Sequence, residues 1–111
     1  MAYVKDYSGR MVYRVENDTI YDYSGRILYR INGNYVNDSI GRIQFRLNGD
    51  TINDNSGRIL LRLRGSDVCD HSGRILYRLS GDNICDHSGR IICRLDGYMS
   101  GSDLAAVIAI I

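Results

Sequence analysis

Two short segments of the sequence carry residue types that bind metals. Cys69-Asp70-His71 and Cys85-Asp86-His87 each place a cysteine and a histidine two residues apart, and both residue types are zinc ligands. If the chain runs as an antiparallel meander, a whole strand separates the two segments by ~9–10 Å, whereas tetrahedral ligands converge to ~2 Å from one ion. We therefore expect no metal site and no cofactor.

The same segments continue into serine, as Asp70-His71-Ser72 and Asp86-His87-Ser88. Aspartate, histidine and serine form catalytic triads, but their side chains must then make one hydrogen-bonded chain. Three consecutive residues of a tight turn cannot make it, and the turn recurs in near-equivalent copies, so no polar cluster is unique. We expect turn-forming residues, no catalytic residues and a protein that is not an enzyme.

The cysteines are expected to be free thiols. The separation that excludes zinc also excludes a bond between Cys69 and Cys85, since bridged Cα atoms lie within ~7 Å. Cys93 takes the place of a core Tyr or Phe. Three cysteines, an odd number, fit a reducing compartment.

These segments belong to a tandem repeat of sixteen residues. Glycine recurs at this interval, with Asp three residues before it and Arg one and five residues after it. The six glycines are Gly9, Gly25, Gly41, Gly57, Gly73 and Gly89. Two glycine turns per copy leave two segments of about five residues, a strand's length and too short for a stable helix. Residues 1–98 are therefore predicted to form six β-hairpins, or about twelve strands.

Each copy contains two kinds of turn. Asp-x-Ser-Gly fits a type I turn that begins at Asp, is capped by the Asp carboxylate and ends in a left-handed Gly. The third copy has Ile40 in place of Ser. Asn32-Gly33 and Asn48-Gly49 mark tighter two-residue turns.

Alternation along the longer strand assigns its two faces. Ile27, Tyr29 and Ile31 share one face, predicted to be the core face, and Leu28 lies with the arginines on the other. The equivalent core residues are Met11, Tyr13, Val15, Ile43, Phe45, Leu47, Ile59, Leu61, Leu63, Ile75, Tyr77, Leu79, Ile91, Cys93 and Leu95. Gln44 replaces the outward Leu in the third copy.

Closure into a barrel would remove the two unpaired edges of such a sheet. Twelve strands tilted by ~40° leave a hollow about as wide as a helix. The apolar tail from Leu104 to Ile111 can fill it as a helix, with Ser100 as N-cap and Asp103 three residues later. The predicted fold is a mainly β, closed antiparallel meander barrel around a C-terminal helix within residues 99–111. A parallel β-solenoid and a propeller-like or oligomeric arrangement are alternatives, and the β-branched tail could form a strand.

Length and charge limit the remaining possibilities. The 111 residues correspond to a single domain, and a formal net charge of +1 gives no reason to expect a nucleic-acid partner. The sequence shows no secretory signal, and its longest apolar stretch is far shorter than the ~20 residues of a membrane-spanning helix. We expect a soluble, cytoplasmic protein.

The arginine rows are the candidate contact surface. One interpretation is a ladder of cross-strand Arg–Asp ion pairs, each contributing ~0.2–1 kcal/mol. The other is an apolar belt flanked by guanidinium groups that meets an anionic lipid surface, an acidic protein or another copy of the chain. The candidate contact residues are Arg14, Arg30, Arg46, Arg62, Arg78, Arg94, Leu28, Leu60 and Leu76.

The repeat unit D-x-S-G-R-I-x-x-R-I, followed by an apolar tail, resembles the small bacterial β-flower hairpin-repeat proteins, whose function is uncharacterised. The inferred architecture is similar to Tubby-like domains and their scramblase and LURP-one relatives. That second likeness implies phosphoinositide binding, but no binding residue of those domains aligns with a position here. We expect a non-catalytic structural or interaction module, with a lipid- or phosphate-binding domain as the alternative.

Overall fold

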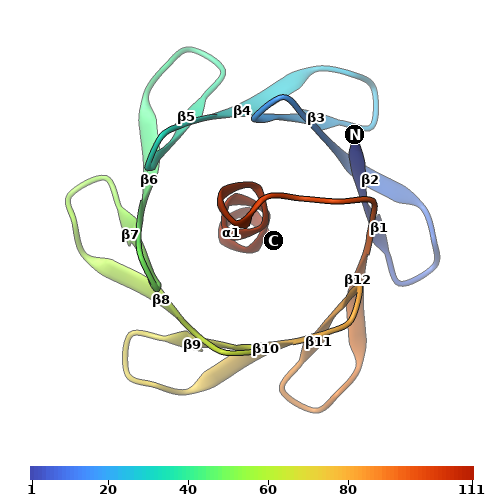
Figure 1. Cartoon of the computed structure of the whole chain (residues 1–111), viewed down its shortest axis with the longest axis vertical. Coiled ribbons are helices and arrows are strands. Elements are labelled where there is room, and N and C mark those ends of the chain that lie inside the picture. Colours follow the sequence, from blue (N-terminus) through green and yellow to red (C-terminus); the bar gives the residue numbers. More distant parts are fainter.

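The computed structural model describes all 111 residues as a closed, mainly β barrel with one helix. Strands adjacent in sequence pair antiparallel, and β1 pairs with β12 to close the ring (Figure 1). The strands are β1 (Ala2–Asp6), β2 (Met11–Glu16), β3 (Thr19–Asp22), β4 (Ile27–Asn32), β5 (Tyr35–Asp38), β6 (Ile43–Asn48), β7 (Thr51–Asp54), β8 (Ile59–Arg64), β9 (Asp67–Asp70), β10 (Ile75–Ser80), β11 (Asn83–Asp86) and β12 (Ile91–Asp96), and the helix is α1 (Gly101–Ile110). The predicted meander barrel and C-terminal helix are confirmed.

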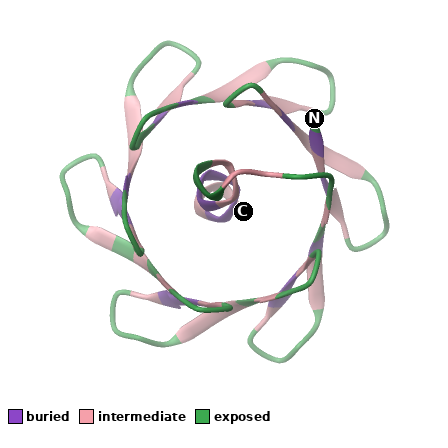
Figure 2. Cartoon of the chain, in the orientation of Figure 1, coloured by how far each residue is buried: buried purple, intermediate pink, exposed green.

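The barrel is a flat ring with principal extents of 35, 34 and 17 Å. At one end, six Asp-x-x-Gly loops project outward, while the tight turns and the segment leading into α1 lie at the other end (Figure 1). We call these loops petals; they comprise residues 6–11, 22–27, 38–43, 54–59, 70–75 and 86–91. Their tips are exposed, and the buried residues lie on the strands and on α1 (Figure 2).

The tight turns lie one residue later than predicted. Asn32 is still a paired strand residue, so the turn consists of Gly33 and Asn34. Gly33 has a φ of +62° and Asn34 has no positive φ, as in a type II′ turn with Gly first. The first turn has no glycine, and Asn17 and Asp18 both adopt positive φ (53° and 59°), as a type I′ turn requires.

One predicted ring of core residues lies on the outside of the barrel. Ile20 pairs with Tyr29, but the next residue, Tyr21, pairs with Ile27, so Leu28 is an extra residue in β4. This β-bulge interrupts the alternation and places Ile27 on the outward face. The same shift occurs in all six petal hairpins. The core prediction was therefore wrong for Met11, Ile27, Ile43, Ile59, Ile75 and Ile91, none of which belongs to the buried core.

Three rings of inward side chains surround the barrel axis. The short strands contribute the most deeply buried ring, each member at most 1% exposed: Val4, Ile20, Val36, Ile52, Val68 and Ile84. The long strands contribute the two other rings, as predicted: Tyr13, Tyr29, Phe45, Leu61, Tyr77 and Cys93, and Val15, Ile31, Leu47, Leu63, Leu79 and Leu95.

Helix α1 lies at the centre of the ring and buries four consecutive residues, Ala105 to Ile108 (Figure 1). Ser100 is its N-cap, as predicted, and its Oγ accepts a hydrogen bond of 3.1 Å from the backbone N–H of Asp103. A helix of this length rises ~15 Å, which matches the 17 Å short axis of the barrel. At ten residues, α1 falls short of what a membrane-crossing helix needs.

Candidate functional site

Each petal is built around the carboxylate of its first residue. Asp70 Oδ1 accepts hydrogen bonds from the backbone N–H and hydroxyl of Ser72, at 2.9 and 2.7 Å, and from the backbone N–H of Arg74 at 3.0 Å. The Ser72 hydroxyl first, and then the Arg74 N–H, lower the pKa of Asp70 to about 2. Asp86 has the equivalent bonds to Ser88 and Arg90 and a pKa of about 2.

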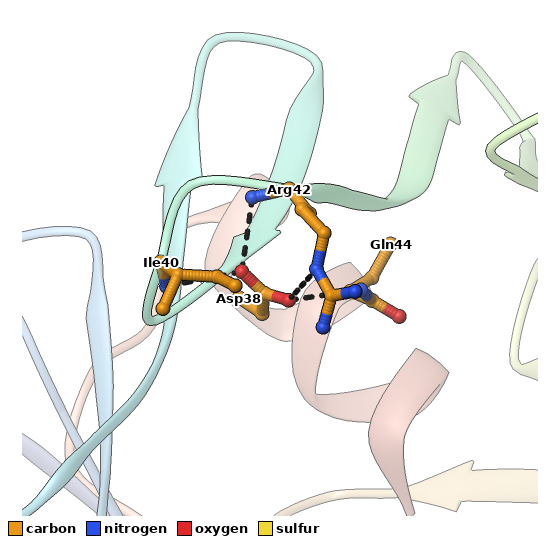
Figure 3. A network of polar contacts seen from close by, with 4 residues as sticks. All are labelled: Asp38, Ile40, Arg42 and Gln44. Carbon is orange, nitrogen blue, oxygen red and sulfur yellow. Dashed lines mark hydrogen bonds and ion pairs between the residues drawn. The ribbon is translucent and has the colours of Figure 1, made fainter.

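The third petal lacks this hydroxyl and satisfies its aspartate differently (Figure 3). Ile40 occupies the serine position, and Asp38 Oδ1 accepts only the backbone N–H groups of Ile40 and Arg42. Oδ2 accepts Arg42 Nε at 3.0 Å and Gln44 Nε2 at 3.2 Å. Partial burial raises the pKa of Asp38, but the Arg42 N–H, the Arg42 guanidinium and the Ile40 N–H outweigh it and lower the pKa overall.

The Asp-His-Ser segments do not form a triad. The Ser72 hydroxyl donates to Asp70 at 2.7 Å, and His71 lies exposed at the petal tip. Ser88 and Asp86 repeat the arrangement at 2.6 Å. The hydroxyl is thus committed to the turn carboxylate instead of to an imidazole base.

The Cys-x-His segments are divided between two environments. Cys69 and Cys85 are buried in β9 and β11, opposite Arg62 and Arg78, whereas His71 lies exposed in a petal. All three cysteines are free, and no three His, Cys, Asp or Glu side chains gather as metal ligands would.

The petal arginines pair within their own loops. Four of them have Nε 3.0–3.9 Å from the aspartate four residues earlier, with Arg42–Asp38 the shortest. These pairs are Arg26–Asp22, Arg42–Asp38, Arg58–Asp54 and Arg74–Asp70. These four pairs form within one loop and not across strands as in the expected ladder, whereas Arg78 and Asp67, 3.7 Å apart, do form a cross-strand Arg–Asp pair.

The second arginine of each copy lies on the outer wall, and we call these six residues the arginine ring: Arg14, Arg30, Arg46, Arg62, Arg78 and Arg94. In the strand register, each of these arginines lies directly opposite an outward-facing residue of the neighbouring strand. That neighbour is the next short strand or, for Arg94, β1. Arg14 stacks over Tyr21, with the guanidinium carbon 4.3 Å from the ring centre, and Arg46 stacks over Tyr35 at 5.4 Å.

Only two members of the arginine ring have a carboxylate within 4.0 Å. Arg78 lies 3.7 Å from Asp67, and Arg14 lies 3.9 Å from Glu16. The other four guanidinium groups form no ion pair: Arg30, Arg46, Arg62 and Arg94.

One groove on the outer wall combines a ring arginine with apolar bulge residues. This groove of about 690 Å³ is lined by Arg58, Ile59, Leu60, Arg62 and His71, and the Leu60 residue is 37% exposed. Leu28 and Leu76, the equivalents of Leu60, are half-buried. Of the predicted contact residues, Leu60 and Arg62 line this groove together.

Compared with the models of known protein families, with curated proteins and with solved structures, the chain matches none of them.

A second groove at Arg62 is lined by seven residues that were not predicted as contacts, and two of these carry nitrogen donors in their side chains. They are Arg64, at the end of β8, and His71, from the next petal. A sequence signal for Arg64 exists: the equivalent positions of the other copies hold Glu16, Asn32, Asn48, Ser80 and Asp96. Its basic side chain is therefore unique to this copy.

Proposed function

We propose that the protein is a non-catalytic interaction module whose outer wall binds an acidic protein partner. The contact residues are the arginine ring together with Leu28, Leu60 and Leu76. One observation carries the proposal: four of the six ring guanidiniums have no carboxylate within 4.0 Å.

The chain does not lack carboxylates for these arginines. It has 13 acidic residues, and four petal arginines do have aspartate partners. Unpaired guanidiniums with five donors each favour planar, anionic groups such as side-chain carboxylates. A partner carboxylate can therefore bind without first displacing an existing ion pair.

The apolar residues beside the ring support a protein partner. Leu60 is exposed between Arg58 and Arg62, and the other bulge residues lie at equivalent places around the wall. Protein interfaces combine apolar centres with arginine and aromatic side chains, and Arg46 over Tyr35 adds such a pair. An acidic segment with apolar side chains complements both features.

The shape of the wall favours a protein over a lipid bilayer. The ring follows the circumference of a body 35 Å across and 17 Å thick, so a flat membrane could meet only one sector of it. A lipid- or phosphate-binding role is the second candidate, because unpaired guanidiniums also bind phosphate oxygens. An acidic chain, unlike a bilayer, can follow the curved wall.

A charge-matched pair of variants tests the proposal. The ring variant R30S/R46S/R62S/R94S removes four unpaired guanidiniums, and the petal variant R26S/R42S/R58S/R74S removes four paired ones. Binding of fluorescent polyglutamate is measured at two salt concentrations, with flotation on neutral and phosphatidylserine vesicles in parallel. We expect salt-sensitive polyglutamate binding that the ring variant loses and the petal variant retains. Equal losses, or binding confined to anionic vesicles, would contradict the proposal.

A further inference from the structure

One groove on the outer wall has a charge pattern that its counterparts lack. Three equivalent grooves lie beside the tight turns, at Arg46, Arg62 and Arg94. The residue two positions after the arginine is neutral in the first (Asn48), basic in the second (Arg64) and acidic in the third (Asp96). Of these three grooves, only the one that contains Arg62 and Arg64 has two guanidinium groups.

Neither of these guanidiniums is neutralised within the protein. Arg62 and Arg64 have no carboxylate within 4.0 Å. Asp67 is the cross-strand neighbour of Arg64, but its carboxylate lies 3.7 Å from Arg78 instead. Asp50, at the exposed tight turn, is the one carboxylate that lines the groove.

His71 adds an imidazole to the lining of this groove. His71 comes from the petal after β9 and lines both the groove of Arg64 and the neighbouring groove of Leu60. The hydroxyls nearby are already committed, since Ser72 donates to Asp70 and Thr51 donates to the Asn48 carbonyl. The available donors are therefore the two guanidiniums and the imidazole.

We propose that this groove, of about 460 Å³, binds a phosphate monoester. Two guanidiniums can each donate a pair of hydrogen bonds to the oxygens of a phosphate dianion, and the imidazole N–H of His71 can donate one more. This assignment rests on the proposed function, because it makes the phosphate group the anchor of the anionic partner.

The groove at Arg94 is an internal comparison. It contains Lys5 and Arg94, but it also contains Asp82 and Asp96, and Lys5 Nζ lies 3.0 Å from Asp96 Oδ2. Its charges are balanced within the protein. The groove at Arg46 has a single guanidinium, which is stacked over Tyr35.

Titration of the ¹⁵N-labelled protein with inorganic phosphate and with phosphoserine tests the site. We expect saturable amide shifts confined to residues around Arg62–Arg64 and His71. R62S/R64S should weaken binding about tenfold or more, whereas R10S/R90S, in two other petals and with the same change in net charge, should weaken it less than about twofold. D50N should strengthen binding because it removes the only carboxylate of the groove. Unchanged melting temperatures of all three variants confirm that they are folded.

Equal weakening by R10S/R90S, or shifts spread evenly over the six copies, would overturn the site. Two further titrations, with an acidic phosphoserine peptide and with phosphatidic acid vesicles, identify the source of the phosphate. If phosphate fails to bind but polyglutamate still binds through the arginine ring, this assignment fails and the proposed function stands. If the ring variant retains polyglutamate binding, the proposed function itself fails.

Discussion

Gln44 Nε2 donates a hydrogen bond of 3.2 Å to Asp38 Oδ2, a contact found in the third petal alone. The same petal has Ile40 where the others have serine, so two departures from the repeat meet at one carboxylate (Figure 3). Gln44 and Arg42 together supply side-chain donors in place of the missing serine hydroxyl, which donates to the aspartate in the other petals.

This relationship predicts that Ile40 and Gln44 are energetically coupled. Gln44→Leu should reduce the free energy of unfolding by about 0.5–1.5 kcal/mol, the usual contribution of one hydrogen bond. The same change should have a smaller effect in an Ile40→Ser background, where a hydroxyl again reaches Asp38. A double-mutant cycle from urea unfolding measures the coupling. Strictly additive effects would show that the two residues act independently.

The petal aspartates predict a loss of stability in acid. Their pKa values are lowered in the folded protein, to about 2 for Asp70 and Asp86, chiefly by the serine hydroxyls and then by backbone N–H groups. The stability that these carboxylates supply is present above their unfolded pKa of ~3.9 and is lost as the pH falls towards 2. Urea midpoints should therefore decrease between pH 4 and 2, and less steeply in D70N/D86N. A midpoint independent of pH over this range would contradict the predicted contribution.

Asp103 is expected to have the opposite pH dependence. Burial, together with the neighbouring Asp18 carboxyl, raises its pKa, and its Oδ1 has no hydrogen-bond partner. A raised pKa means that the stabilising contribution is present below the unfolded value and lost as the pH rises through the folded one. Asp103→Asn should therefore raise the melting temperature at pH 7 and have little effect near pH 3. Asp18→Asn should give a smaller gain, and Ser102→Asn on the exposed helix surface none. A lower melting temperature for Asp103→Asn at pH 7 would show that the carboxylate is favourable there.

The regular spacing of the repeat made most of the fold predictable. The glycine interval predicted the strands, and Ser100 predicted where α1 begins. The bulge was missed because simple alternation assumes that each strand residue faces a single residue of the neighbouring strand. In the structure, Ile27 and Leu28 together lie opposite Tyr21. Two adjacent apolar residues before Tyr29 were the only local sign of it. The tight turns were placed one residue too early because the Asn32-Gly33 dipeptide indicates a turn but does not specify the last residue that still pairs in the strand.

The sequence predicted where the arginine rows lie, but it did not predict which carboxylate each arginine meets. The arginine spacing placed both rows on the surface, yet which carboxylate each guanidinium meets depends on loop geometry. Asp38 and Arg42 meet because the petal folds back on itself. The groove of Arg64 and His71 also depends on the packing of one petal against the preceding hairpin, which no local pattern specifies.

The central helix predicts that the tail is essential to the fold. Deletion of residues 104–111 exposes the three inner apolar rings to an empty hollow, so the truncated protein should unfold or aggregate. A milder variant, Ala106→Leu, should cost about 1–3 kcal/mol because Ala106 is fully buried and the added atoms have no space. Size-exclusion chromatography and thermal unfolding measure both effects. A truncated monomer with the wild-type melting temperature would show that α1 does not support the barrel.

The arginine side chains themselves give the most direct measurement of the central claim. Their Nε–Hε resonances can be followed by NMR during a polyglutamate titration, which reports each guanidinium without any substitution. The structure predicts that the unpaired ring arginines shift and saturate, while petal arginines such as Arg42, already bonded to Asp38 at 3.0 Å, remain unchanged. Equal shifts of both rows would contradict a specific contact surface, because they would show that the acidic chain responds only to net charge.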